Sequence, residues 1–182
     1  MNKMIPLGYM YKRVEKKPNY FKKDYIVDIY SLSNCISKDF AEYLEYWKHN
    51  GHGLFNSPNI MKEIAKINNL DLASCTLFYY EGYELEYDDD LREWHKYEPD
   101  PDLETVIESP IAKNLHGFDV ANYSMSTIPD CSPLSCNYVA NEVNVNEHCL
   151  FRTFEEAKSS LESGVFVNTE PGPNRIIAVY TL

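Results

Sequence analysis

The stretch DCSPLSCNYVANEVNVNEHC, residues 130–149, gathers the side chains of this chain that are best suited to chemistry. It contains Cys131, Cys136 and Cys149 together with His148. A thiol beside a histidine base is the pair that makes a cysteine nucleophile, and closely spaced cysteines and histidines also hold zinc. The same residue types fill ordinary cores, because unpaired cysteine is among the most buried of all residues.

One hypothesis makes this stretch the active site of a cysteine-dependent hydrolase or acyl-transfer enzyme. Ser132 and Pro133 have the N-cap and first-turn signature of a short helix, which places Cys136 in its first turn. Amide dipoles at a helix start lower the pKa of a thiol. His148 would accept the thiol proton from a neighbouring strand, with Asn146 orienting the histidine. The alternative is a packed thiol and a hydrogen-bonded histidine.

The spacing in this stretch argues against a metal centre. Residues 143–151 alternate between apolar and polar side chains, which predicts a strand with His148 and Cys149 on opposite faces. Four residues separate Cys131 from Cys136, which is loose for a zinc knuckle. Further ligands would have to come from distant histidines, namely His49, His52 and His116. We therefore expect no metal and no cofactor.

Other sequence signatures of catalysis and ion binding are missing. The chain has no P-loop, no glycine-rich dinucleotide fingerprint, no H-E-x-x-H and no G-x-S-x-G. Asp100, Asp102 and Glu104 have the alternate spacing of a calcium loop, but the glycine at the sixth position and the acidic twelfth ligand are absent. These absences argue against a nucleotide-binding protein, a zinc protease, a hydrolase of the G-x-S-x-G type and a calcium-binding loop.

The charge of the chain limits its partners. Its 28 acidic and 17 basic residues give a formal net charge of -11. The field of such a protein repels phosphate backbones and anionic lipids, so we expect neither a nucleic-acid partner nor a membrane partner. The one notable basic cluster, YKRVEKK at residues 11–17, is interpreted as a solvated N-terminal segment.

The compartment follows from what the sequence lacks. The first residues have no apolar core of signal-peptide length, and no segment approaches the roughly 20 apolar residues of a membrane span. The five cysteines, an odd number, are then expected to be reduced thiols rather than a disulfide framework. These features predict a cytoplasmic protein.

The first half of the chain predicts one strand and two helices. Alternation and β-branched residues favour a strand over residues 24–32. A helix is expected from Ser37 to about Gly51, and a second one from Pro58 up to Asn68-Asn69, because each has a serine cap and an apolar face. The strand is expected to present one face made of Tyr25, Val27 and Ile29.

The middle of the chain predicts a long strand and then a loop. Residues 76–90 alternate between apolar and acidic side chains, so one face should meet the core and the other water. Gly82 inside this strand indicates a bulge or a hairpin turn. Residues 88–104 are acidic and contain prolines, which is typical of a surface excursion.

The last third predicts two strands around a short helix. Strand character resumes at Gly117, and RIIAVYTL at residues 175–182 is typical of a buried strand. Thr153 and Glu156 have the spacing of a capping box for a helix over residues 153–163. Ser132-Pro133 starts a further helix expected to reach about residue 140. We find no internal repeat in the sequence.

Together these elements predict an α+β fold, with residues 1–182 forming a single domain. About five or six strands should form one mainly antiparallel sheet, with two to four helices covering a face. The preferred functional hypothesis is a small acidic binding protein, of the inhibitor or immunity type, that engages a basic protein partner. Tyrosine is enriched at interface cores, so the expected contact residues are Tyr79, Tyr83, Glu84 and Glu86.

Overall fold

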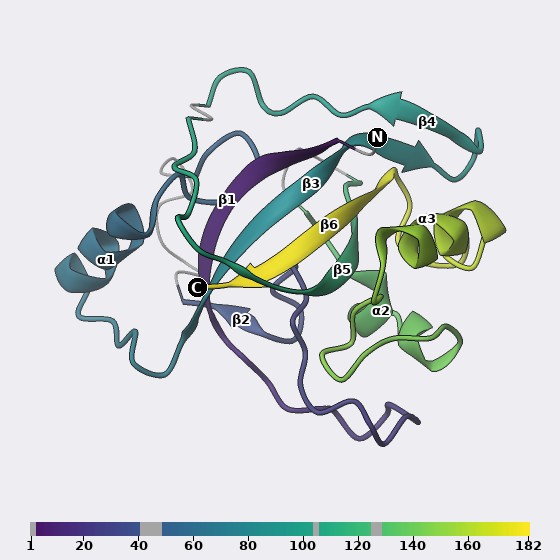
Figure 1. Ribbon diagram of the computed structural model, residues 1–182, viewed down its shortest axis with the longest axis horizontal. Helices are drawn as coiled ribbons and strands as arrows, with labels where there is room; N and C mark the ends of the chain where they lie inside the picture. The colour runs from purple at the N-terminus through teal and green to yellow at the C-terminus, as the bar shows by residue number, and fades with distance from the viewer. Residues whose placement is uncertain (1–2, 41–48, 104–105, 125–128) are drawn as a thin grey trace.

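The computed structural model is built around one curved antiparallel sheet (Figure 1). It describes residues 3–40, 49–103, 106–124 and 129–182. The sheet order is β2-β1-β3-β6-β5, and β4 pairs with a free part of β3. The strands are β1 (Met4–Arg13), β2 (Lys38–Asp39), β3 (Thr76–Asp88), β4 (Glu93–Lys96), β5 (Asn114–Asn122) and β6 (Asn174–Thr181).

Within the described ranges, three α-helices and one short 3-10 turn accompany the sheet. They are α1 (Pro58–Ile67), α2 (Pro133–Cys136), η2 (Val139–Asn141) and α3 (Phe154–Ser163). In Figure 1, α1 lies beyond β1 on one side of the sheet, and α3 lies beside β5 and β6 on the other. The predicted α+β class is confirmed. None of the helices in the described ranges is long and apolar enough to cross a membrane.

Several predicted elements form where the sequence placed them. Helices α1 and α3 and strands β3, β5 and β6 are confirmed. Helix α3 has the predicted capping box, since the Thr153 side chain accepts from the Glu156 N–H while the Glu156 side chain binds the Thr153 N–H. Next to Gly82 the β3–β6 register shifts. The glycine is required there because a Cβ atom would lie 2.8 Å from Cζ of the buried Arg175.

Residues 24–32 do not form the predicted strand. The segment is irregular because its backbone is shared between two partners: the Ile29 N–H donates to the Glu15 carbonyl, whereas the Val27 N–H donates to the Glu147 carbonyl. Its side chains therefore do not share a face. Val27 is 52% exposed while Ile29 is fully buried.

Residues 143–151 also form no strand, contrary to prediction. The Asn146 side-chain oxygen accepts from the backbone N–H groups of His148 and Leu150, which bends the chain into an arch. Cys149 has a φ of 63° in the left-handed region. Local amide-to-backbone bonds thus replace the ladder that alternation had indicated.

The predicted helices at Ser37 and Pro133 differ in the structure. The Ser37 hydroxyl donates to the Ile29 carbonyl, and the next two residues form β2 against β1. Residues 41–48 of the predicted helix lie outside the described residues. Helix α2 ends at Cys136, short of residue 140, because the chain turns at Tyr138, whose φ is 63°.

Two strands lie in segments that were interpreted as irregular. Strand β1 includes the start of the basic cluster, and Lys12 within it is fully buried rather than solvated. Strand β4 forms a hairpin with β3 inside residues 88–104. A proline and a glycine in β1 hide its alternation, because both residues are unfavourable in regular strands.

The structure contains an internal repeat, so the prediction of none was wrong. Each half has a strand, an arch, a ten-residue helix and a returning antiparallel strand. The first half uses β1, residues 50–55, α1 and β3. The second half uses β5, residues 146–151, α3 and β6. The shared sequence is only Asn-x-His-x-Leu-Phe, which occurs in both arches and is too short to stand out.

Matching asparagines shape the two arches. The Asn50 Nδ2 donates to the Leu7 carbonyl at 2.8 Å, and the Asn146 Nδ2 donates to the His116 carbonyl at 2.7 Å. Each asparagine Oδ1 accepts from the N–H groups two and four residues later. The left-handed position that Gly53 occupies in the first arch is occupied by Cys149 in the second.

The register of the sheet gives the repeat its symmetry. Tyr80 pairs with Gly8 in the first half, and Val179 pairs with Gly117 in the second. Tyr80 and Val179 also pair with each other across β3 and β6. Equivalent positions of two antiparallel strands therefore face one another, which places a local twofold axis between β3 and β6, perpendicular to the sheet.

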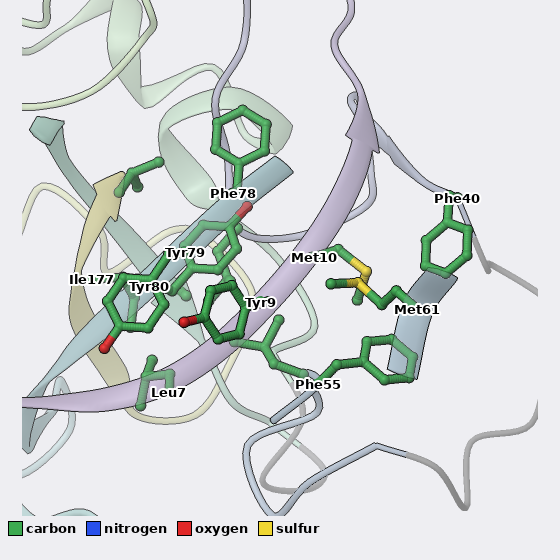
Figure 2. Packing of buried hydrophobic residues seen from close by; sticks show 14 of the residues in the cluster. Leu7, Tyr9, Met10, Phe40, Phe55, Met61, Phe78, Tyr79, Tyr80 and Ile177 are labelled. Atoms are coloured by element: carbon green, nitrogen blue, oxygen red, sulfur yellow. The ribbon is translucent and has the colours of Figure 1, made fainter. Parts of the chain in front are cut away.

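One large cluster of buried apolar residues lies against the first half of the sheet (Figure 2). The rings of Tyr9 and Tyr79 lie 4.9 Å apart between centroids. Met10 and Met61 bring β1 and α1 together in the same cluster. A second cluster, which includes Val120, Phe154 and Leu161, packs α3 against β5 and β6.

We predict that the two glycines under the arches are intolerant of a side chain. A Cβ atom at Gly8 would lie 2.6 Å from the Phe55 oxygen, and one at Gly117 would lie 2.5 Å from the Phe151 oxygen. Both also have positive φ values. Gly8→Ala and Gly117→Ala should each lower the free energy of unfolding by about 3 kcal/mol in urea titrations.

Gly164→Ala is the matched control for these two variants. Gly164 also has a positive φ, but its Cβ would meet nothing closer than 3.5 Å. It should cost about 1 kcal/mol, the price of the backbone conformation alone. Equal losses of unfolding free energy in all three variants would show that close contact with the arches adds nothing to the cost of a side chain at Gly8 or Gly117.

We predict a pH-dependent stability term from His52. Burial, and then the charge of Arg175, lower the pKa of His52 from 6.5 to about 4. In the unfolded chain His52 becomes protonated below about pH 6.5, whereas in the folded chain it stays neutral down to about pH 4. The free energy of unfolding therefore decreases as the pH falls from 6.5 to 4. The difference in unfolding free energy between wild type and His52→Gln should shrink by up to about 3 kcal/mol from pH 7 to 4. A pH-independent difference would contradict it.

Candidate functional site

Three cysteines from distant parts of the chain meet at one place. The sulfur atoms of Cys35, Cys131 and Cys136 all lie within 4.8 Å of one another. Cys131 precedes α2, Cys136 ends it, and Cys35 comes from the loop before β2. We call this set the three-cysteine cluster. Cys35 is exposed and Cys131 is buried, so the cluster opens to solvent on the Cys35 side.

Reciprocal serine bonds fix the Cys35 loop against α2. The Ser33 N–H donates to the Ser132 hydroxyl oxygen at 3.1 Å, and the Ser132 N–H donates to the Ser33 hydroxyl oxygen at the same distance. The Ser132 hydroxyl and the Leu32 N–H both donate to one carboxylate oxygen of Asp119. Burial raises the pKa of Asp119 to about 6 although these bonds favour its ionised form. This network sets the distance between Cys35 and the other two thiols.

Lys12 holds the same loop from the opposite side. Its ammonium donates to the carbonyl oxygens of Ser31, Leu32 and Ser33 at 2.9, 2.8 and 2.6 Å. It also lies 3.3 Å from a carboxylate oxygen of Asp39. A fully buried ammonium is costly unless its donors are bound, and here three carbonyls and a carboxylate surround it.

The thiols of the cluster influence one another. Hydrogen bonds from Cys131 and Cys136 lower the pKa of Cys35, and the nearby Lys12 charge lowers it further. The hydrogen bonds of Cys131 with Cys136 and then with Cys35 raise the pKa of Cys131, because a second thiolate beside the first is unfavourable. Cys149 does not belong to the cluster. Burial raises the pKa of its thiol.

The structure does not join Cys136 to His148. The Cys136 sulfur lies 3.4 Å from the Ser33 hydroxyl, whereas the His148 Nδ1 lies 2.6 Å from a carboxylate oxygen of Asp28. Among the described residues, no recorded contact links the thiol to the imidazole. The ring of His148 instead stacks on Tyr30 at 4.1 Å between centroids.

The Asn146 side chain binds backbone groups and not the His148 ring. It acts on the backbone of the arch, and the group that fixes the His148 ring is Asp28. The other histidines are also engaged elsewhere. His116 binds Thr181 and has its pKa lowered by burial, while His52 is buried beside Tyr97.

The four predicted binding residues on β3 offer little surface to a partner. Tyr79 is 1% exposed and lies in the first core cluster (Figure 2), and Tyr83 is 8% exposed and lies in the second. Glu84 is half-buried and lies 3.6 Å from Lys3. Glu86 is half-buried too, and burial raises its pKa. Residues of β3 pack into both core clusters, so its two tyrosines have little exposed surface.

Acidic surface lies instead in a groove beside α3. A hollow of about 530 Å³ is lined by the segment before the second arch and by the first half of α3. We call it the α3 groove. Its lining residues are Glu142, Val143, Asn144, Phe151, Glu155, Glu156, Ser159 and Ser160. The lining contains glutamates and no basic residue.

A second acidic hollow follows at the far end of α3. It has a volume of about 190 Å³ and lies between the β3–β4 turn and the segment before β6. Its acidic residues are Asp88, Asp89, Asp90 and Glu170. The β3–β4 hairpin is attached to α3, because the Arg92 guanidinium donates to the Glu162 carbonyl at 3.3 Å and the Trp94 indole N–H of β4 donates to the Glu162 carboxylate at 2.9 Å.

Some of these site residues had no signal in the sequence. Cys35 lies 96 positions before Cys131 and has no motif around it, so its convergence with the other cysteines depends entirely on the fold. Asp28 was assigned to a strand that does not form. The capping box in the sequence predicted the acidic first turn of α3. It did not predict that this turn lines a groove.

Comparison of the chain with protein-family models, with curated proteins and with solved structures finds no match.

We predict an order of thiol labelling in the reduced, chelator-treated protein. Cys35 is exposed and its thiolate is favoured by two thiol donors, so iodoacetamide should modify it first. Cys149, which is 2% exposed, should react only when the protein unfolds. Peptide mass spectrometry across a time course measures both. If Cys136 reacted before Cys35, the Cys136 nucleophile hypothesis would regain support.

Proposed function

We propose that this protein is a binding protein of the inhibitor or immunity type, which engages a basic protein partner through the α3 groove. The observation that carries the proposal is the lining of the groove, where three glutamates surround a hollow without a cation. The contact surface proposed here lies on α3, whereas the sequence led us to expect it on β3. The partner is still expected to be a basic protein.

Two of the groove carboxylates are free to bind a cation. Glu142 and Glu155 are exposed, and neither has an ion pair within the described part of the chain. Glu156 is partly used, because its carboxylate accepts from the backbone N–H groups at the start of α3. An arginine or lysine of a partner can fill the hollow and form charge-assisted hydrogen bonds with the free carboxylates.

The groove has a rigid base. Phe154, Ala157 and Leu161 bury one face of α3, and the capping box and Gly164 fix its two ends. Helix residues held in this way lose little entropy when a partner binds. The helix backbone therefore holds Glu155 and Glu156 at fixed positions along the groove.

Long-range electrostatics supports the same partner class. The net charge of -11 attracts a basic protein from a distance and accelerates its association. The second hollow, with three consecutive aspartates in the β3–β4 turn, extends the acidic surface beyond the groove. A basic partner that spans both hollows would contact α3 along its length.

The proposal predicts that charge reversal in the groove weakens binding of a basic ligand. The probe is a fluorescent octapeptide of alternating arginine and serine, and its affinity is measured by anisotropy at 50 mM and 300 mM salt. Glu142→Lys combined with Glu155→Lys should weaken binding at least about tenfold, because each reversal replaces an attraction with a repulsion.

Glu63→Lys combined with Glu98→Lys is the matched control. Glu63 lies on α1, the helix equivalent to α3, and both residues are exposed and outside the two hollows. The control variant changes the net charge by the same amount and should retain most of the wild-type affinity for the peptide. If both double variants lost affinity equally, net charge alone would explain the binding and the groove would not be the site.

A further inference from the structure

We propose that the three-cysteine cluster binds one thiophilic metal ion, Zn²⁺ or Cu⁺, through the sulfurs of Cys35, Cys131 and Cys136. This site is independent of the α3 groove and of the function proposed for it. The sequence suggested no metal because only two of these cysteines are near each other in the chain. The fold supplies the third.

The sulfur positions are suited to one ion. Zinc–sulfur bonds are about 2.3 Å long, so three sulfurs of a tetrahedral site lie about 3.8 Å apart. The three sulfurs already lie within 4.8 Å of one another. Small side-chain rotations are therefore enough to bring all three into bonding distance.

The backbone that carries the thiols is already fixed. The Cys131 carbonyl accepts from the Asn122 N–H of β5 at 2.8 Å, and the Cys136 N–H donates to the Ser132 carbonyl at 2.9 Å. The serine pair and Lys12 hold the chain two residues before Cys35. Little ordering remains to be done when an ion binds, which favours affinity.

The ligand set selects soft ions and leaves one position open. Thiolates favour Zn²⁺ and Cu⁺ over Mg²⁺ and Ca²⁺, which prefer oxygen donors. Among the described residues, no fourth cysteine, histidine or carboxylate belongs to the group. Water or an external donor would complete a tetrahedral zinc site on the exposed Cys35 side, whereas Cu⁺ needs no fourth ligand in a trigonal site.

Charge balance favours the same assignment. Three thiolates with Zn²⁺ carry one net negative charge, and with Cu⁺ they carry two. The Lys12 ammonium is placed to offset part of this charge, because it binds the Ser33 carbonyl beside the cluster. Asp119 binds Ser132 and Leu32 rather than the three sulfurs.

The test is metal titration of the full chain after reduction and removal of metal. Zn²⁺ is titrated against a chromophoric chelator, and Cu⁺ is titrated anaerobically against a Cu⁺-specific chelator. Co²⁺ provides a spectroscopic arm, because thiolate ligation gives strong charge-transfer absorption. We expect one ion per chain and protection of all three thiols from alkylation.

Cys35→Ser is the informative variant, since the exposed position of Cys35 makes it the least disruptive of the three. It should weaken binding of the preferred ion at least about 100-fold and abolish the Co²⁺–thiolate bands. Cys75→Ser is the matched control, because the Cys75 thiol contacts Asp71 and lies outside the cluster. It should bind like the wild type.

Three results would overturn the proposal. One is equal affinity of wild type and Cys35→Ser for both ions. Another is an affinity loss in Cys75→Ser as large as that in Cys35→Ser, which would indicate nonspecific thiol binding. The third is a fully reduced wild-type protein that takes up neither ion from the chelators. Circular dichroism of each variant separates loss of a ligand from loss of the fold.

Discussion

Two buried charged residues, Lys12 and Asp119, tie together parts of the molecule that the sheet alone leaves apart. Lys12 lies on β1 and Asp119 on β5, which are separated in the sheet by β3 and β6. The ammonium binds the carbonyls of residues 31–33, and the carboxylate binds the Leu32 N–H. A single loop therefore connects the two ends of the curved sheet. Burial of two charges is expensive, and only complete hydrogen bonding on both sides offsets the cost.

The same loop explains why the three-cysteine cluster exists. Cys35 follows the residues that Lys12 and Asp119 hold, and Ser132 joins the loop to the start of α2. The polar network thus has a geometric consequence beyond stability, because it sets the position of one thiol relative to two others. The proposed metal site depends on this network in the way that ligand geometry in metal sites commonly depends on surrounding hydrogen bonds.

The internal repeat shows how two similar halves acquired different surfaces. In both halves an arch packs against a glycine of a strand, and the chain then continues into a ten-residue helix. Helix α1 has no acidic residue in its first turn, whereas α3 has Glu155 and Glu156 there. The segment before the second arch adds Glu142, which completes the acidic lining of the α3 groove. The common scaffold fixes the helix positions, and the substituted residues decide what each helix can bind.

The sequence by itself determined the elements whose signals are local. The capping box of α3, the proline start of α1 and the alternation in β3 are short-range features, so they predicted those elements correctly. The acidic charge, and hence the class of partner that electrostatics permits, was also determined by composition. The strand expected at residues 143–151 failed because Asn146 bends the backbone there, a local competition that alternation does not reveal.

Only the tertiary structure decided which residues meet. Cys35 joins Cys131 and Cys136, Asp28 takes the place expected for Asn146 beside His148, and Tyr79 and Tyr83 turn inward. Each of these outcomes depends on contacts between segments far apart in the chain. Such contacts follow from the curvature and register of the whole sheet, because β3 packs into both core clusters and residues 31–33 bind both β1 and β5. No local pattern of residue types encodes that geometry, which is why the chemistry-bearing residues could be named from the sequence but not assembled from it.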